Sequence, residues 1–219
     1  MTTQLAHLPT TKYALALHTT TPELGLVISN FADDTRANVW NLGRDVSSFI
    51  HQYLIDLINP QTWTDLAFIG VAKGPGGFTG SRIGVVTART LGQQLEIPVF
   101  AVSTLAAVAW TELKKNQQSR NVIAVEMPAQ RGQVFAAIYQ PTADDLGITA
   151  LLPDTVFTPE AWQETLANWQ TEYQLIKATS SLAATVTSIL ELAYLDWQQG
   201  KRPNWSEALP YYGQHPVDV

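Results

Sequence analysis

One stretch of the chain has the composition of a ligand-binding loop. Residues 74–84 read GPGGFTGSRIG, and they directly follow the apolar run LAFIGVAK at 66–73, which predicts a strand. A glycine-rich turn between a strand and a helix can hold a phosphate on its free amide groups, or it can let two backbones approach closely. The segment fits neither phosphate-loop pattern, because Pro75 and Thr79 occupy positions where the Walker and dinucleotide patterns require glycine. The motif alone favours a tight structural turn with Thr79 as the helix cap.

Other residue types with catalytic or metal-binding chemistry are scarce. The chain of 219 residues contains no cysteine and four histidines, so thiol nucleophiles, disulfides and thiolate metal sites are excluded. No two histidines have metal-ligand spacing on a common helix face. The paired carboxylates Asp33-Asp34 and Asp144-Asp145 are expected in solvated turns. A net charge of −6 with only thirteen Lys and Arg makes nucleic acid an unexpected direct ligand.

The helix that follows the glycine loop has a side without bulky residues. Gly80, Gly84, Ala88 and Gly92 recur every four residues, so they lie along one side of the helix. Interior glycines cost about 1 kcal/mol each relative to alanine, so close packing must offset this cost. Two interpretations stay open: the strip packs on the protein's own sheet, or it contacts another subunit.

The surrounding elements predict a mixed α/β protein. A hairpin is expected at 13–29 and a short strand at 36–40, followed by an amphipathic helix that ends at Asn59-Pro60. Strands and helices then alternate as far as Lys115. A second hairpin over 121–139 repeats the first, and a proline-punctuated connection and two further helices follow it. The pattern predicts two halves of related architecture, of which the second is reduced.

The stretch GPGGFTGSRIGVVTARTLGQQLEIPVFAVSTLAAVA at 74–109 resembles the signature of the bacterial TsaB (YeaZ) family, GPGSFTGxRIG…A…GLA…PxxxVSTL. The opening hairpin ALALHTTTPELGLVI and the element RGQVF at 131–135 are similar to further family motifs. The resemblance covers residues 13–140 well and the remainder in outline. It implies an actin-like ATPase fold (ASKHA, ribonuclease H-like) with two lobes. A tail at 1–11, a first lobe at 12–116 and a reduced second lobe at 117–219 are expected, with the last helix packing back on the first lobe.

The resemblance also implies a function. TsaB proteins are similar to the transferase TsaD but non-catalytic, and they pair with it in the complex that makes threonylcarbamoyladenosine beside the anticodon of tRNA. TsaD, TsaE and TsaC are therefore the expected partners, and tRNA is expected to bind only through the complex. The resemblance predicts no tightly bound cofactor, because ATP and metal belong to the partner subunits. The expected location is the cytoplasm, with no membrane association, and the isolated chain is expected to form homodimers.

Several positions depart from the residues that an actin-like enzyme needs. His18 stands where the first hairpin carries a metal-holding Asp, and Pro128 stands at the matching turn of the second half. Thr104 and Val108 stand where the catalytic relative has its two metal-binding histidines. The tail at Tyr211-Tyr212 lacks the arginine usual in the family. An independent actin-like ATPase or kinase is the alternative function, and a protease is a third, weaker one.

The family's subunit contact uses the first two helices of the first lobe. The resemblance therefore places a partner interface at Val46, Phe49, Ile50, Tyr53, Gly80, Arg82, Ile83, Gly84, Thr87 and Ala88. A nucleotide at the subunit boundary would contact Gly74, Gly76, Gly77 and Thr79. No catalytic residue and no metal ligand is predicted.

Overall fold

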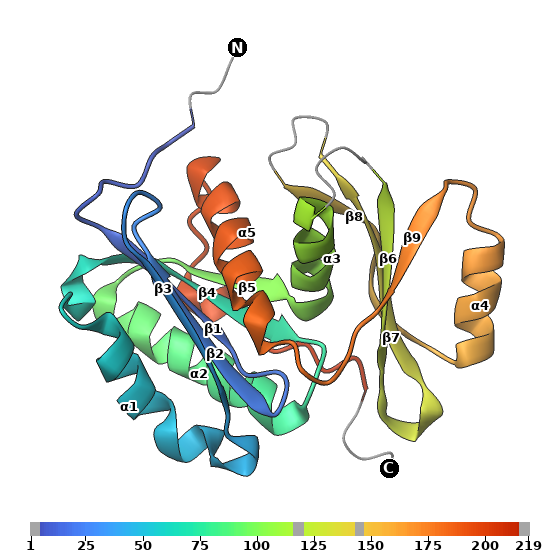
Figure 1. Cartoon of the computed structure of the whole chain (residues 1–219), viewed down its shortest axis with the longest axis horizontal. Coiled ribbons are helices and arrows are strands. Elements are labelled where there is room, and N and C mark those ends of the chain that lie inside the picture. The colour runs from blue at the N-terminus through green and yellow to red at the C-terminus, as the bar shows by residue number, and fades with distance from the viewer. Residues whose placement is uncertain (1–4, 116–120, 143–146, 215–219) are drawn as a thin grey trace.

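The computed structural model describes residues 5–115, 121–142 and 147–214. Two mixed sheets lie side by side, with two long helices between them (Figure 1). In the described part of the chain, no helix combines the length and the apolar character needed to cross a bilayer.

The first sheet has five strands in the order β3-β2-β1-β4-β5. The strand β2 runs antiparallel to both β1 and β3, whereas β4 and β5 are parallel to β1. Its strands are β1 (Tyr13–His18), β2 (Glu23–Ser29), β3 (Thr35–Asn41), β4 (Leu66–Gly74) and β5 (Val99–Ser103). The three central strands are apolar on both faces because helices cover both sides of the sheet.

Helices α1 (Val46–Ile58) and α2 (Phe78–Leu95) cover one face of this sheet. Their buried side chains share one core with alternate residues of β1, such as Leu15 and Leu17. Helices α3 (Thr104–Lys115) and α5 (Val186–Gln198) lie on the other face, between the two sheets (Figure 1). There α5 packs on β1 and β4.

The second sheet has four strands in the order β8-β7-β6-β9. They are β6 (Val122–Pro128), β7 (Val134–Pro141), β8 (Ile148–Phe157) and β9 (Tyr173–Lys177), and α4 (Pro159–Ala167) packs on the outer face. The sheet has the order and directions of the first sheet without the fifth strand. The predicted actin-like fold with a reduced second lobe is therefore confirmed.

Two strands of the second sheet differ from the prediction. The connection expected around Pro153 is the edge strand β8, which tolerates a proline because the register shifts twice along its pairing with β7. The strand β9 was not predicted, since YQLIK is short and follows a polar turn. The last helix begins at Val186 rather than Ser181, after a 3₁₀ turn at Ala183–Thr185.

The structure describes only part of the expected tail and does not describe the expected lobe boundary. The lobe boundary near residue 116 and the first four residues of the tail lie outside the described residues. Residues 5–11, expected to be loose, instead contact α5: the Ala6 N–H donates to the Gln198 carbonyl, and Leu8 is buried.

Candidate functional site

The glycine loop between β4 and α2 is filled by the chain's own backbone. The Gly77 N–H donates to the Thr20 carbonyl at 2.7 Å. A Cβ on Gly76 would lie 2.3 Å from that carbonyl oxygen, and a Cβ on Gly74 would lie 2.3 Å from the Tyr211 carbonyl oxygen. Gly74 also has a φ of +109°, which disfavours other residues. The glycines therefore let the β1–β2 turn and the C-terminal segment approach the loop closely.

The small-residue strip of α2 faces inward, so one part of the predicted interface is wrong. A Cβ on Gly80 would lie 2.0 Å from the Thr19 carbonyl oxygen, and one on Gly84 would lie 2.3 Å from Thr19 Oγ1. Ala88 is completely buried, and a Cβ on Gly92 would meet Val99. The strip exists because α2 packs closely on its own sheet and on the turn after β1, which buries Gly84, Ala88 and Gly92 and leaves Gly80 only partly exposed.

The predicted interface residues on α1 are likewise partly buried and partly accessible. Val46 and Ile50 are buried against the first sheet, so they are not available to a partner either. Phe49 is 47% exposed, and Tyr53 is half-buried with its ring stacked on Trp40, at 4.3 Å between centroids. Most apolar positions of the helix thus serve the chain's own core, because one face of α1 covers β2.

The remaining predicted interface residues lie on the outer side of α2. Arg82 is exposed and lies over the Phe78 ring at 5.3 Å, whereas Ile83 and Thr87 are half-buried. Val86 was not predicted, but at 59% it is among the most exposed large apolar side chains of the described residues. Ile55 on α1 is 48% exposed. The sequence does not show which apolar side chains are exposed, so Val86 and Ile55 could be identified only from the structure.

A cleft of about 1000 Å³ separates the two lobes. Its walls are formed by four segments: the turn after β1, the glycine loop, the start of α1 and the tip of the second hairpin. Of the four positions proposed for a nucleotide contact, Gly76, Gly77 and Thr79 line the cleft and Gly74 does not. The walls combine hydroxyl and amide side chains with apolar ones such as Ile83, Met127 and Phe135. The described residues that line the cleft include Arg44 but no Asp or Glu, so they offer no carboxylate to a metal-bound nucleotide.

His18 does not reach this cleft. The residue ends β1 with a completely buried ring, and neither ring nitrogen has a hydrogen-bond partner. Burial penalises the charged imidazolium and lowers the pKa of His18 to about 4. His18 is therefore a neutral core residue at physiological pH. Pro128 does line the cleft, at the tip of the second hairpin.

The two positions that match the catalytic relative's histidines have structural contacts. Thr104 is completely buried, and its hydroxyl lies 3.1 Å from that of Thr20. Val108 is buried in the core between α3 and the second sheet. Among the residues that the structure describes, no group of three or more His, Cys, Asp or Glu side chains could hold a metal ion.

A polar cluster that sequence reasoning missed connects the two lobes. The Ser103 hydroxyl of β5 donates to Asp154 of β8 at 2.8 Å, and the Tyr139 hydroxyl donates to the same carboxylate oxygen at 2.9 Å. Ser103 also accepts the N–H groups of Leu105 and Ala106, which caps α3. No sequence pattern indicated the cluster, because its members come from distant parts of the chain.

The electrostatics of this cluster follow from burial. Desolvation raises the pKa of Asp154, although the hydrogen bonds from Ser103 and Tyr139 act in the opposite direction. Desolvation, and next the nearby Asp154 charge, also raise the pKa of Tyr139 far above its ordinary value. Tyr211 adds a hydrogen bond from its hydroxyl to the Asp154 carbonyl at 2.7 Å. The group is therefore suited to holding the lobes together rather than to proton transfer.

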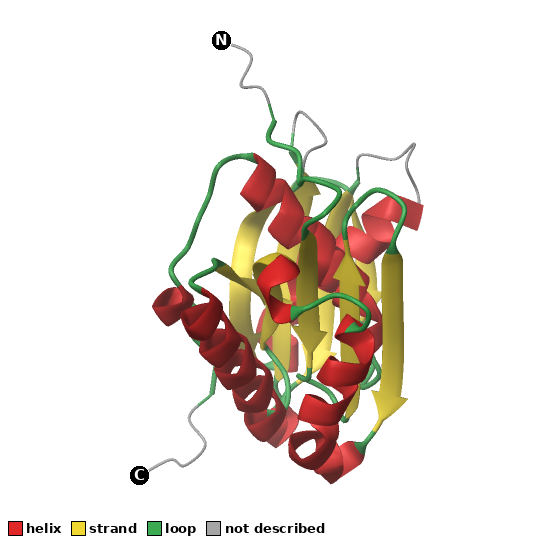
Figure 2. Ribbon diagram, turned by 90° about the vertical axis from the view of Figure 1, so that its left-hand side faces the viewer, coloured by secondary structure: helices red, strands yellow, loops and turns green. Residues whose placement is uncertain are grey.

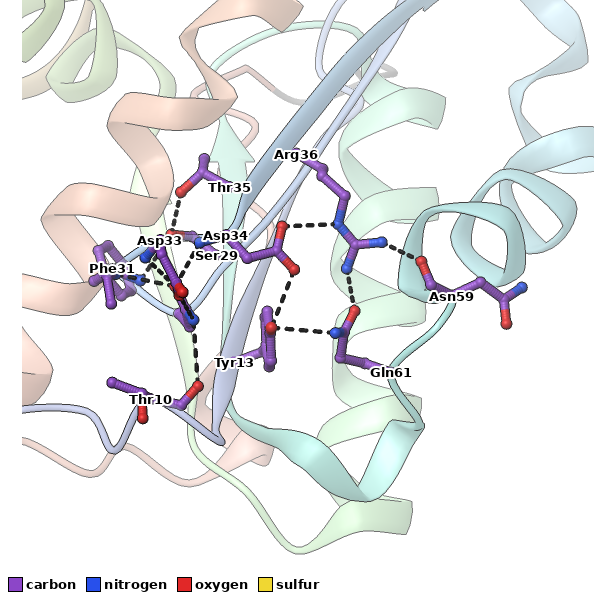
Figure 3. Close-up of polar contacts among 12 residues, drawn as sticks. Thr10, Tyr13, Ser29, Phe31, Asp33, Asp34, Thr35, Arg36, Asn59 and Gln61 are labelled. Carbon is purple, nitrogen blue, oxygen red and sulfur yellow. Dashed lines mark hydrogen bonds and ion pairs between the residues drawn. The ribbon is translucent and has the colours of Figure 1, made fainter.

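The acidic pair Asp33-Asp34 has a structural role in the turn between β2 and β3 (Figure 3). Asp34 accepts from the Tyr13 hydroxyl at 3.0 Å and pairs with Arg36 at 3.2 Å. Asp33 accepts from the Asn30 side chain at 2.8 Å. The pair thus lies in a turn, as predicted, where Asp33 is exposed and these contacts order the chain. The second pair, Asp144-Asp145, lies outside the described residues.

Comparisons with known proteins identify the family. The family model described as "TsaD: tRNA N6-adenosine threonylcarbamoyltransferase" matches residues 51–193. The tRNA threonylcarbamoyladenosine biosynthesis protein TsaB of Bacillus subtilis is 42% identical over 92 residues, which are 42% of this chain and 37% of that protein. The protein of the same name from Escherichia coli is 35% identical over 115 residues, which are 49% of this chain and 47% of that protein. The matched segments thus span less than half of these relatives.

Solved structures agree on the fold. YeaZ from Pseudomonas aeruginosa superimposes with a TM-score of 0.74 and 21% identity, over 92% of this chain and 99% of that chain. A Pseudomonas aeruginosa protein described as similar to peptidase YEAZ gives a TM-score of 0.75 at the same identity, over 93% of this chain and 100% of that chain. At this identity the likeness concerns the fold alone. Taken with the family model and the sequence relatives, it shows that the chain belongs to the family that the TsaD model describes and, within it, to the TsaB (YeaZ) group.

Proposed function

We propose that this chain is a non-catalytic, dimer-forming subunit of the cytoplasmic complex that makes threonylcarbamoyladenosine in tRNA. The names of its sequence relatives support the pathway. The observation that carries the non-catalytic role is the composition of the inter-lobe cleft, whose described lining residues include no carboxylate. An actin-like enzyme would need one to hold the metal of its nucleotide. In this proposal ATP and metal act on partner subunits, and this chain binds no cofactor tightly.

The proposed partner is a TsaD-type protein, and the outer surface of α1 and α2 is the proposed contact. Phe49, Ile55 and Val86 expose apolar side chains there, and the half-buried Ile83 and Thr87 lie on the same pair of helices. Exposed apolar side chains of this size gain most when a partner removes them from water. This surface replaces the buried strip of small residues in the sequence-based assignment. In the absence of TsaD, a second copy of the chain would cover the same surface.

The complex would include further proteins. TsaE would bind to the assembled pair, and TsaC would supply the activated threonylcarbamoyl group. The chain's net charge of −6 favours contact with tRNA through the partners rather than directly.

The partner surface can be tested by placing charges on it. Val86→Glu and Phe49→Glu are expected to weaken binding to the TsaD protein of the same organism by at least about tenfold, because a buried unpaired carboxylate opposes association. Isothermal titration calorimetry would measure the affinity. Leu151→Glu is the matched control, because Leu151 is an exposed apolar residue of β8 in the second lobe. Equal affinity for all three variants and the unmodified chain would refute the assignment.

Isothermal titration calorimetry also tests the alternative function, an independent ATPase. We expect no heat of binding when ATP and Mg²⁺ are added to the isolated chain. Micromolar binding, with ATP hydrolysis by the isolated chain, would support the enzyme instead.

A further inference from the structure

Residues 209–214, called the strap below, form part of the wall of the cleft between the lobes. Directly before the strap, Ala208 is buried in the core of the first lobe. The strap then passes to the second lobe, where Gln214 contacts the tip of the second hairpin. Tyr212 and Gln214 line the cleft together with residues of both lobes. The strap is therefore a wall of the cleft that belongs to neither sheet.

On the first lobe, the strap lies against the glycine loop. The Tyr211 N–H donates to the Lys73 carbonyl at 2.7 Å, and the Tyr211 carbonyl lies against Gly74. The next residue, Tyr212, places its ring 4.5 Å from the ring of Phe78, measured between centroids. Because Phe78 begins α2 and lines the cleft, Tyr212 covers the helix where it reaches the cleft.

On the second lobe, the strap covers part of an apolar wall. A Cβ on Gly213 would lie 2.9 Å from the Phe135 ring, so the backbone of the strap packs directly on that ring. Phe135 is paired with Met127 across β6 and β7, and both side chains line the cleft. The Gln214 side-chain amide accepts the Gln130 N–H and donates to the Gln130 carbonyl, each at 3.2 Å. These two bonds fasten the end of the strap to the second hairpin.

Few hydrogen bonds hold the strap in this position. Its backbone makes one hydrogen bond to the rest of the described chain, the bond from Tyr211 to Lys73. The other polar contacts come from two side chains, the Tyr211 hydroxyl on the Asp154 carbonyl and the Gln214 amide, which also donates to the Gln133 side chain. Segments with few backbone hydrogen bonds open locally at a fraction of the free energy of global unfolding. The strap can therefore detach while both sheets stay folded.

We propose that the strap is a lid with a closed and an open form, and that its opening exposes the apolar wall of the cleft. In the closed form Tyr212 covers Phe78, and Gly213 covers Phe135. Gln214 is the latch, because its amide ties the strap to the second lobe. The inference rests on contacts within this chain, so it does not depend on the proposed complex.

Hydrogen exchange on the intact chain tests whether the strap opens by itself. The Tyr211 amide, bonded to Lys73, should exchange at least about 100-fold faster than the Val71 amide of the central strand β4. Low concentrations of urea should accelerate exchange at Val71 but not at Tyr211, because a local opening exposes little surface. Gln214→Ala should accelerate exchange at Tyr211 about tenfold, because the closed form loses its latch. Gln163→Ala, at an exposed position on α4, is the matched control and should leave the rate unchanged.

Equal protection of the two amides, with the same dependence on urea, would overturn the proposal. It would show that the strap separates only when the whole chain unfolds.

A single thiol tests whether the opening exposes the cleft. The chain has no native cysteine, so Met127→Cys places one thiol on the second-lobe wall of the cleft. Its reaction with 5,5′-dithiobis(2-nitrobenzoate), without urea, should become about tenfold faster when Gln214→Ala is added, and Gln163→Ala should not change it. Ala129→Cys, half-buried on the same wall, replaces Met127→Cys if that variant does not fold. An unchanged thiol rate combined with faster exchange at Tyr211 would contradict the proposal, since the strap would then be a loose segment that does not control the cleft.

Discussion

His18 occupies a position that carries a metal-holding carboxylate in actin-like enzymes, but here its role is structural. The first hairpin of an actin-like enzyme ends in a carboxylate, but this chain has a buried imidazole there, without a hydrogen-bond partner for either nitrogen. Burial in the core lowers the pKa of His18 to about 4, so the imidazole is neutral near pH 7. The core therefore has no buried charge to solvate. The residue therefore contributes packing, and it makes the stability of the chain depend on pH.

The pH dependence has a definite sign. In the unfolded chain His18 takes up a proton below its ordinary pKa of 6.5, whereas the folded chain excludes the proton until about pH 4. The free energy of unfolding should therefore fall as the pH falls through this window, by roughly 3 kcal/mol at most. Urea unfolding at several pH values measures the slope. His18→Leu should reduce it, whereas His51→Leu, at an exposed position on α1, should not, and identical slopes for all three proteins would contradict the assignment.

At the scale of elements, the turn after β1 and the first sheet determine which residues α2 can carry on its inner side. Its glycines accept the turn after β1 so closely that the Thr19 hydroxyl donates to the Gly80 carbonyl at 2.8 Å. Helix propensity alone would favour alanine at this position by about 1 kcal/mol. The close approach of a rigid backbone carbonyl outweighs this preference, which is the physical reason for the small-residue strip.

Gly80→Ala should therefore destabilise the chain although alanine favours helices. We expect a loss of about 2 kcal/mol in the free energy of unfolding, because the added Cβ would lie 2.0 Å from the Thr19 carbonyl oxygen and the turn must move. Gly77→Ala is the control, since its Cβ would lie at an ordinary 3.5 Å from the nearest atom. Chemical denaturation compares the two variants, and an equally stable or more stable Gly80→Ala would show that the turn moves without cost.

At the scale of the whole molecule, two connections hold the lobes. The helix α5 follows the second sheet in sequence but packs on the first, where Tyr194 and Trp197 stack with Phe68 at 6.3 and 5.9 Å. Figure 2 shows the helices beside the strands, seen from the left-hand side of Figure 1. The second connection is the cluster around Asp154, which ties β8 to the start of α3.

The Asp154 cluster gives a prediction about lobe geometry. Asp154→Ala should lower the free energy of unfolding by about 2 kcal/mol, because the Ser103 and Tyr139 hydroxyls lose their acceptor. Asp154→Asn should cost less, since its amide oxygen can still accept both hydrogen bonds. Because burial raises the pKa of Asp154, the unmodified chain should also lose stability as the pH rises from 3.8 through that raised pKa, and the Asn variant should lack this loss.

Spin labels can follow the lobes directly, because the chain has no native cysteine. Labels at Thr90→Cys and Glu164→Cys, both exposed and on opposite lobes, report one distance between α2 and α4. The distance distribution should broaden in Asp154→Ala and stay narrow in Asp154→Asn. A narrow distribution in both variants would show that other contacts, such as those of α3 and α5, fix the lobes without Asp154.

Local sequence patterns determined a large part of this protein. Short apolar runs bounded by turn residues, and apolar side chains three and four residues apart, predicted most strands and helices of the first lobe, and the repeated hairpin predicted the second, reduced lobe. The motif at 74–109 indicated the family by its resemblance to the family signature, and its glycines meet requirements of this chain's own backbone. The strands and helices could be predicted because they depend on neighbours in sequence, where steric and hydrogen-bond rules act directly.

Only the tertiary structure decided which faces are free. The strip of Gly80 and Gly84 and the stripe on α1 are equally compatible with an internal core and with a subunit contact, since both remove apolar surface from water. The Asp154 cluster and the packing of α5 on the first sheet arise from segments far apart in the chain. Their contacts depend on how those segments are brought together, and no local pattern of residues records that.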